Sequence, residues 1–153
     1  MNIRSAREED FSAVKAITHG TISSIYPHYY PAGAVAYFLQ YHSDEVIRQD
    51  IAAGIVYLCC DAAGTPVGTV TVRENEITRL FVLPESQGNG YGRALLDFAE
   101  EAVAAAFDEI VLSSSFSAKT IYQKRGYEEV AFHRIETGNG DFLCFDEMKK
   151  RVR

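Results

Sequence analysis

Three glycines at alternate positions, Gly88, Gly90 and Gly92, form the segment whose residue types and spacing most clearly predict chemistry. They leave successive backbone amides unshielded by side chains and free to adopt positive φ angles. A short apolar run at 80–83 precedes them, and an amphipathic helical pattern follows. Unpaired N–H groups and the positive dipole end of that helix would attract an anion. The segment therefore predicts a strand, a loop that binds phosphate or pyrophosphate, and a helix.

Two common phosphate-binding motifs do not fit this loop. A P-loop requires Lys and then Ser or Thr after its last glycine, and no such pair follows these glycines. A dinucleotide-binding fingerprint requires a further glycine where Arg93 or Leu95 stands. The pattern that fits is Gln-x-x-Gly-x-Gly at Gln87, Gly90 and Gly92, which resembles the pyrophosphate-binding motif of the GNAT superfamily of acyl-CoA-dependent N-acyltransferases. The structural alternative is a glycine-rich turn that only lets the strand and the helix pack closely.

A second motif follows at residues 115–127. It resembles the GNAT signature Asn-x-x-Ala-x-x-Phe-Tyr-x-Lys-x-Gly-Phe, with matches at Ala118, Tyr122, Lys124 and Gly126, whereas Ser115 stands where Asn is frequent. We expect a helix that the preceding serines cap and Gly126 ends, with Ala118 and Tyr122 on one face. The resemblance extends over essentially the whole chain and is strongest at residues 69–127.

The resemblance implies acetyl-CoA as the cofactor and N-acetylation as the activity. The cofactor would contact main-chain N–H groups of Leu80, Phe81 and Val82, the loop residues Gln87, Gly88, Asn89, Gly90, Tyr91, Gly92 and Arg93, and also Ser115, Ala118 and Tyr122. No metal is expected.

The resemblance also implies two catalytic side chains. Tyr122 would be the general acid that protonates the departing thiolate, although an aromatic residue close to a helix-ending glycine is also typical of a core. Glu76, eleven residues before Gln87, would be the general base, directly or through a water. A solvated charge beside a turn is the structural alternative for Glu76, and His133 and Glu136 are further candidates for the base.

The acceptor is expected to be a primary amine of a small molecule or peptide. Tyr26, Tyr29 and Tyr30 lie in a segment interrupted by two prolines, which is either a wall of the substrate site or a lid over the core. The competing class of function is a catalytically silent acyl-CoA-binding module, in which the loop binds the nucleotide and the acceptor pocket serves another purpose.

Positioning these residues requires a mixed sheet. Before residue 54 the pattern indicates a strand at 2–5, a helix that ends near Gly20, a helix at about 31–41 and another that Ser43 caps. Runs at 55–61, 67–73 and 76–83 predict an antiparallel meander, and the strand at 109–112 follows a crossover helix and must run parallel to its neighbour. A final hairpin turns at Asn139-Gly140. The predicted fold is α/β and GNAT-like, with a mostly antiparallel sheet, one splayed parallel strand pair and flanking helices in a single domain, 1–153.

Composition narrows the remaining function classes. The formal net charge of −6 argues against a nucleic-acid partner, and no run has the length of a membrane span. The N-terminal sequence lacks a signal-peptide pattern, so we expect a cytoplasmic protein. Cys59, Cys60 and Cys144 show no C-x-x-C spacing and are expected to be buried thiols. The basic residues at 149–153 are expected to form a solvated end. Dimers are common in the superfamily, so a homodimer is compatible with the resemblance.

Overall fold

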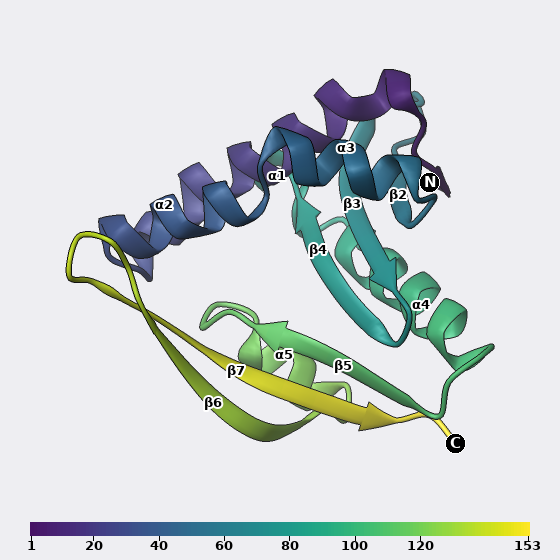
Figure 1. The fold of residues 1–153 in the computed structure, drawn as a ribbon. Coiled ribbons are helices and arrows are strands. Elements are labelled where there is room, and N and C mark those ends of the chain that lie inside the picture. The colour runs from purple at the N-terminus through teal and green to yellow at the C-terminus, as the bar shows by residue number, and fades with distance from the viewer.

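One mixed sheet contains all seven strands of the protein, in the order β1-β2-β3-β4-β5-β7-β6 (Figure 1). The structure is a computed structural model that describes residues 1–153. Every pair of neighbouring strands is antiparallel except β4 and β5. The predicted fold class is therefore confirmed. The strands are β1 (Asn2–Ser5), β2 (Val56–Cys60), β3 (Pro66–Arg73), β4 (Glu76–Val82), β5 (Glu109–Ser114), β6 (Glu128–Glu136) and β7 (Phe142–Arg151).

The parallel pair β4 and β5 is joined only where the two strands begin. Glu76 pairs with Val111, and the Val111 N–H donates to the Asn75 carbonyl at 2.9 Å. No further register pair links the two strands, which then diverge so that the wedge between them opens toward their carboxyl ends (Figure 1). The splayed pair expected from the sequence is therefore present, and the sheet has two arms.

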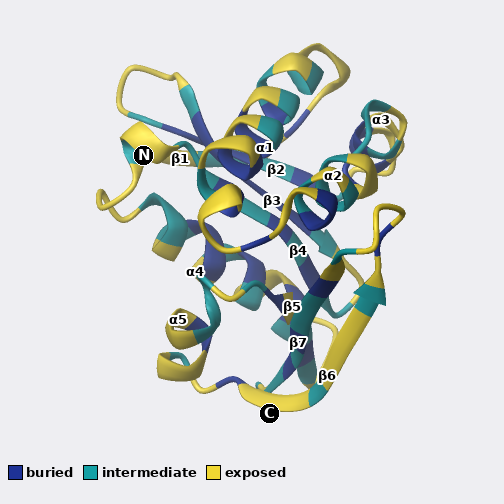
Figure 2. Cartoon of the chain, turned by 90° about the vertical axis from the view of Figure 1, so that its left-hand side faces the viewer, coloured by how far each residue is buried: buried dark blue, intermediate teal, exposed yellow.

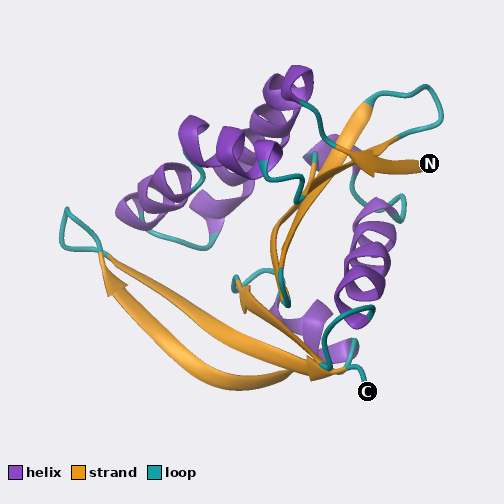
Figure 3. Ribbon diagram, turned by 45° about the vertical axis from the view of Figure 1, so that its right-hand side comes forward, coloured by secondary structure: helices purple, strands orange, loops and turns teal.

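Helices cover the two faces of this sheet (Figure 3). The first layer contains α1 (Phe11–Ile25), α2 (Ala32–Tyr41) and α3 (Asp44–Ala52), and its core includes Ile17, Ile22 and Leu58. The second contains α4 (Tyr91–Ala104) and α5 (Lys119–Lys124), whose core includes Leu95, Ile110 and Met148. No helix is long and apolar enough to cross a bilayer. Figure 2 shows that the outer edge of the sheet, β6, is largely exposed.

Two helix boundaries differ from the sequence prediction. Helix α1 continues past Gly20 to Ile25, because an internal glycine costs only about 1 kcal/mol and the extra turn buries Ile22 completely. Helix α5 begins at Lys119, and no serine side chain caps it. Its first turn is instead held by the Ser115 carbonyl, which accepts from the N–H groups of Ala118 and Lys119 at 3.2 Å.

The basic C-terminal residues are not a solvated end as expected. Residues up to Arg151 belong to β7, and Lys150 Nζ lies 3.2 Å from Glu100 Oε2 on α4. Lys149 pairs with Glu109 at 3.0 Å, so these charges fasten the last strand to its neighbours. All three cysteines are free thiols, and Cys144 is only half-buried.

The tip of the β6–β7 hairpin is fastened to the start of α2. The Gly33 N–H donates to Asp141 Oδ2 at 2.8 Å, and the Asn139 Nδ2 donates to the same carboxylate oxygen at 2.9 Å. A Cβ atom added at Gly33 would clash with the side chains of Asn139 and Thr137, so the close approach favours glycine. The contact bridges the first helical layer and the far arm of the sheet.

The same substitution at two glycines should change stability in opposite directions. Gly20→Ala adds a methyl group with nothing within 4 Å and should stabilise the protein by about 1 kcal/mol, or about 2–4 °C in Tm. Gly33→Ala must displace the hairpin tip and should destabilise it by about 1–3 kcal/mol. Thermal unfolding of both variants checks this, and equal shifts in Tm would contradict the described contact.

Candidate functional site

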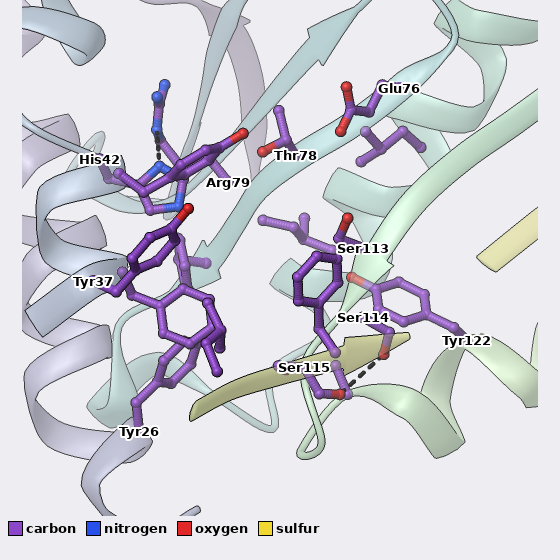
Figure 4. Close-up of a pocket in the computed structure, with 18 of the residues that line it drawn as sticks. Tyr26, Tyr37, His42, Glu76, Thr78, Arg79, Ser113, Ser114, Ser115 and Tyr122 are labelled. Atoms are coloured by element: carbon purple, nitrogen blue, oxygen red, sulfur yellow. Dashed lines mark hydrogen bonds between the residues drawn. The ribbon is translucent and has the colours of Figure 1, made fainter. Parts of the chain in front are cut away.

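A cavity of about 190 Å³ lies where the two arms of the sheet diverge (Figure 4). Strand β4 contributes residues 76–81, and β5 with the following turn contributes residues 113–115. The end of α2 and the hairpin strands β6 and β7 complete the wall. The lining also includes Tyr26, Tyr37, Phe38, Tyr41, His42, Ala118, Tyr122, Ile135, Leu143 and Phe145.

The glycine loop presents unpaired amides at the N-terminus of α4. The backbone N–H groups of residues 88–93 donate no hydrogen bond within the protein. Gly88 and Gly90 adopt positive φ angles of 79° and 84°, and the space that a Cβ would occupy at either is open. These amides stand at the positive end of a fourteen-residue helix. The residues present thus fit a pyrophosphate.

Side chains of the loop brace the loop itself. Gln87 Nε2 donates to the Val82 carbonyl at 3.0 Å, and Asn89 Nδ2 donates to the Ser86 carbonyl at 3.0 Å. Arg93 is exposed, whereas Tyr91 and Gly92 are half-buried. The motif glutamine therefore connects the loop to the end of β4, and the anion-binding groups are the main-chain amides.

Strand β4 turns the N–H group of Val82 toward the opening. The Leu83 N–H donates to the Val67 carbonyl on the β3 side. Because successive residues of a strand alternate in direction, the N–H of Phe81 also faces β3 and that of Val82 faces the splayed side, whereas Leu80 lies where the β3–β4 register shifts and the alternation is interrupted. Of the three backbone groups expected from the sequence, Phe81 is thus directed elsewhere, although its ring lines the cavity.

Tyr122 is buried in the cavity wall. Its side chain shares this wall with Ser115 and Ala118, as the sequence pattern predicted for Ala118. The hydroxyl makes no hydrogen bond within the protein. It is not among the unbonded side-chain atoms that are cut off from solvent, so it is reachable from the cavity (Figure 4). Burial raises the pKa of Tyr122 to about 12, so the phenol keeps its proton at neutral pH.

Glu76 lies at the start of β4, on the opposite wall. Its carboxylate is half-buried, lines the cavity and forms no salt bridge. His133 and Glu136, the other candidates for a base, are exposed on β6 and lie outside the cavity lining. The His133 ring stacks on Phe145 with centroids 4.9 Å apart. Of these three side chains, Glu76 alone faces the cavity.

The three tyrosines of the loop after α1 take different positions. Tyr26 lines the cavity. Tyr30 is buried outside the lining, where its hydroxyl oxygen accepts from the Phe116 N–H at 2.9 Å, and Tyr29 is 52% exposed. The structure therefore brings Tyr26 to the site but not Tyr29 or Tyr30. Tyr37 and Tyr41, from α2, line the cavity in their place.

Sequence reasoning missed the buried polar network on the β4 wall. Arg79 is 5% exposed and donates to Asp50 Oδ2 at 2.8 Å, to Thr71 Oγ1 at 3.0 Å and to His42 Nδ1 at 3.3 Å. Burial lowers the pKa of Arg79, and its bond to Asp50 opposes this effect. Arg79 and Phe81 face the α1–α3 layer, whereas Ile77 packs in the opposite core, because the β3–β4 register shifts between them. A simple period-2 pattern in the sequence therefore does not reveal the position of Arg79.

Comparisons with known proteins agree with this arrangement. No curated protein matches the sequence. A GCN5-related N-acetyltransferase from Rhodopseudomonas palustris is similar in structure, with a TM-score of 0.88, 21% identity and coverage of 99% of this chain and 95% of that chain.

Two further solved structures have the same fold. PaiA N-acetyltransferase from Thermoplasma acidophilum, solved in complex with coenzyme A, has a TM-score of 0.74 at 20% identity and covers 99% of this chain and 98% of its own. The ribosomal-protein-S18-alanine N-acetyltransferase from Escherichia coli has a TM-score of 0.71 at 19% identity, with coverages of 99% and 93%. At these identities the likeness concerns the fold.

Membership follows from the sequence itself. A family model described as an acetyltransferase (GNAT) domain matches residues 25–152, which include both motifs, the strand before the glycine loop and the last hairpin. The match supports acetyl-CoA as the cofactor expected at the glycine loop. This chain belongs to the GNAT family of acetyltransferases.

Proposed function

We propose that this protein transfers the acetyl group of acetyl-CoA to a primary amine of a small molecule or peptide, by direct attack in a ternary complex. The observation that carries the proposal is that Glu76 and Tyr122 line one cavity, which lies where β4 and β5 splay apart and the Val82 N–H faces the opening. A base for the amine, donors for a carbonyl oxygen and an acid for a leaving thiol are the groups that acyl transfer requires.

The chain's own residues would divide the binding of the cofactor between them. The free amides of residues 88–93 would hold the pyrophosphate, and the Val82 N–H would donate to the thioester carbonyl oxygen. Acetyl-CoA supplies the acetyl thioester. Ser115 and Ala118, on the opposite arm, would border the same channel.

Proton transfer would occur at two named atoms. The Glu76 carboxylate would accept the proton that the amine loses, directly or through a water, and the Tyr122 hydroxyl would donate to the departing sulfur. The raised pKa of Tyr122 keeps this phenol protonated, although it also makes it a weaker acid than in water. Donation therefore depends on the fixed position of the hydroxyl.

The alternative function is a catalytically silent acyl-CoA-binding module. The unpartnered Tyr122 hydroxyl and Glu76 carboxylate in one cavity favour the enzyme, because a module that only binds would need neither group. Thiol release from acetyl-CoA, measured with alkylamines, polyamines, amino acids and peptide N-termini, separates the two. Binding of acetyl-CoA without turnover of any amine would support the module.

The first prediction concerns the loop. Gly92→Val should weaken acetyl-CoA binding by at least about tenfold, because a branched side chain beside free amides obstructs a pyrophosphate. Gly92 is the better position than Gly90, since its φ is not positive and an added Cβ meets only Val82 at 3.7 Å. Calorimetric titration measures the affinity. Ala102→Val, an exposed position on the same helix, is the matched control and should bind like the parent.

The second prediction concerns the base. Glu76→Gln keeps the shape and removes the proton acceptor, so kcat should fall most at low pH, where the amine is largely protonated. The affinity for CoA should not change. The pH–rate profiles of parent and variant provide the test, and superimposable profiles would remove Glu76 from the mechanism.

The third prediction concerns the acid. Tyr122→Phe deletes one oxygen and keeps the buried ring, so turnover should fall by roughly 10²-fold while acetyl-CoA affinity and Tm stay nearly the same. Tyr57→Phe is the matched control, because Tyr57 is half-buried, lies outside the cavity and packs its ring on Phe98. A Tyr122→Phe rate within about twofold of the parent would show that this hydroxyl is not the proton donor.

A further inference from the structure

His42 is a buried histidine of the cavity wall whose tautomer is set by its neighbour. The residue is 5% exposed, and the Arg79 Nε–H donates to its Nδ1 atom at 3.3 Å (Figure 4). A guanidinium has no acceptor, so Nδ1 must be the acceptor and the ring proton must be on Nε2. Burial and the Arg79 charge lower the pKa of His42 to about 3, so the ring stays neutral at physiological pH.

Contacts on several sides also hold the orientation of this ring. It meets Tyr41 edge to face at 5.1 Å and Phe81 at 5.9 Å between centroids. The His42 carbonyl accepts from His19 Nε2–H at 2.6 Å, which holds the main chain. The direction of the Nε2–H bond is therefore determined by the fold.

This Nε2–H group has no partner within the protein. Thr18 Oγ1 is the one buried side-chain polar atom that is both sealed from solvent and unbonded, so the His42 Nε2 is reachable from the cavity that the residue lines. An N–H donor in so buried a residue is energetically costly when it is left unpaired. An oxygen atom of a bound acceptor would remove this cost.

The two ends of the cavity differ in the charges of their side chains. Arg79 lies on the His42 wall, and its carboxylate partner Asp50 also pairs with Arg73. Two guanidinium groups therefore share one carboxylate there. Glu76 lies on the other side of the cavity and pairs with no cation (Figure 4). One end therefore favours an amino group, and the other favours an oxygen acceptor, above all an anionic one.

We propose that His42 is a specificity-determining residue, whose Nε2–H donates to a carboxylate or carbonyl oxygen of the acceptor, so that the preferred acceptors are amines that carry such an oxygen close by. Amino acids and peptide N-termini have this chemistry, whereas polyamines and simple alkylamines lack it. The proposal rests on the amine acetylation proposed above and adds the class of acceptor.

Three amines that differ in the substituent on the carbon that carries the amino group test the proposal. Phenylalanine has a carboxylate there, phenylalaninamide has a neutral carboxamide and phenethylamine has neither, while all three share the same ring and amino group. His42→Phe should lower kcat/KM about 10- to 100-fold for phenylalanine and about 3- to 10-fold for the amide, with phenethylamine within about twofold. The ratio of variant to parent cancels the basicity of each amine.

Matched variants separate the hydrogen bond from structural damage. His42→Gln keeps an N–H donor and should recover most of the loss, and His133→Phe, outside the cavity, should change none of the three rates. Acetyl-CoA affinity and Tm report folding. An equal loss for all three probes, or no loss, would overturn the proposal.

A measurement on the unaltered protein covers the case in which His42→Phe does not fold. In ¹⁵N-histidine-labelled protein with CoA, His42 should be protonated at Nε2, and its resonances should shift with phenylalanine or its amide but not with phenethylamine. A proton on Nδ1, or no selective shift, would overturn the proposal. A selective shift without acetylation of any amine would uphold His42 as the donor and reject the proposed catalysis instead.

Discussion

The site depends on one strand, β4, which has a paired neighbour on one side and, after its first residue, none on the other. A strand that lies inside a sheet normally satisfies its backbone groups on both sides. Here the single pair Glu76–Val111 ends the ladder, and the following backbone must find other partners. The opening is therefore both the origin of the cavity and a local energetic cost.

At the opening, the protein supplies hydrogen-bond partners for a backbone carbonyl group but not for a backbone N–H group. The Val82 carbonyl receives Gln87 Nε2 at 3.0 Å and Thr21 Oγ1 at 3.4 Å, two side chains from different elements. The Val82 N–H faces the same opening, where no register pair beyond Glu76–Val111 joins β4 to β5. A paired carbonyl beside an N–H without a strand partner makes this part of the cleft a hydrogen-bond donor, which favours the oxygen atoms of a thioester and of phosphates. The same asymmetry continues into the glycine loop, where the amides of residues 88–93 are free.

Both cores include residues of the two arms. On one face Ile77 of β4 packs in the same cluster as Ile110 and Leu112 of β5. On the other face Phe81 of β4 shares a cluster with Leu143 of β7, so packing on both faces holds the diverging arms in place. The hairpin tip adds a constraint, because the Gly33–Asp141 bond connects α2 to the far arm and holds the third wall of the cavity in place.

The sequence predicted the parts of the site that local chemistry specifies. Alternate glycines before a helix and the Tyr122 segment each have a short-range signature, and their positions followed once the parallel pair was recognised. The acceptor wall has no such signature. His42 precedes a helix cap, and in the cavity wall it accepts from Arg79, thirty-seven positions away. Tyr29 and Tyr30 could not be told from Tyr26 by sequence, since all three are aromatic and their burial depends on how α2 packs.

Arg79 shows why the local sequence pattern does not predict the acceptor wall. It adopts a positive φ of 49° where the β3–β4 register shifts, a conformation that costs a non-glycine residue of order 1–3 kcal/mol. A glycine would avoid this cost but could not reach Asp50, Thr71 and His42. The side chain's three bonds thus stabilise the irregular backbone of β4 beside the opening, and they also orient the histidine of the acceptor wall. Cofactor geometry and acceptor geometry are coupled through one buried guanidinium, so a change in the α2–α3 segment that displaces Asp50 or His42 would alter both.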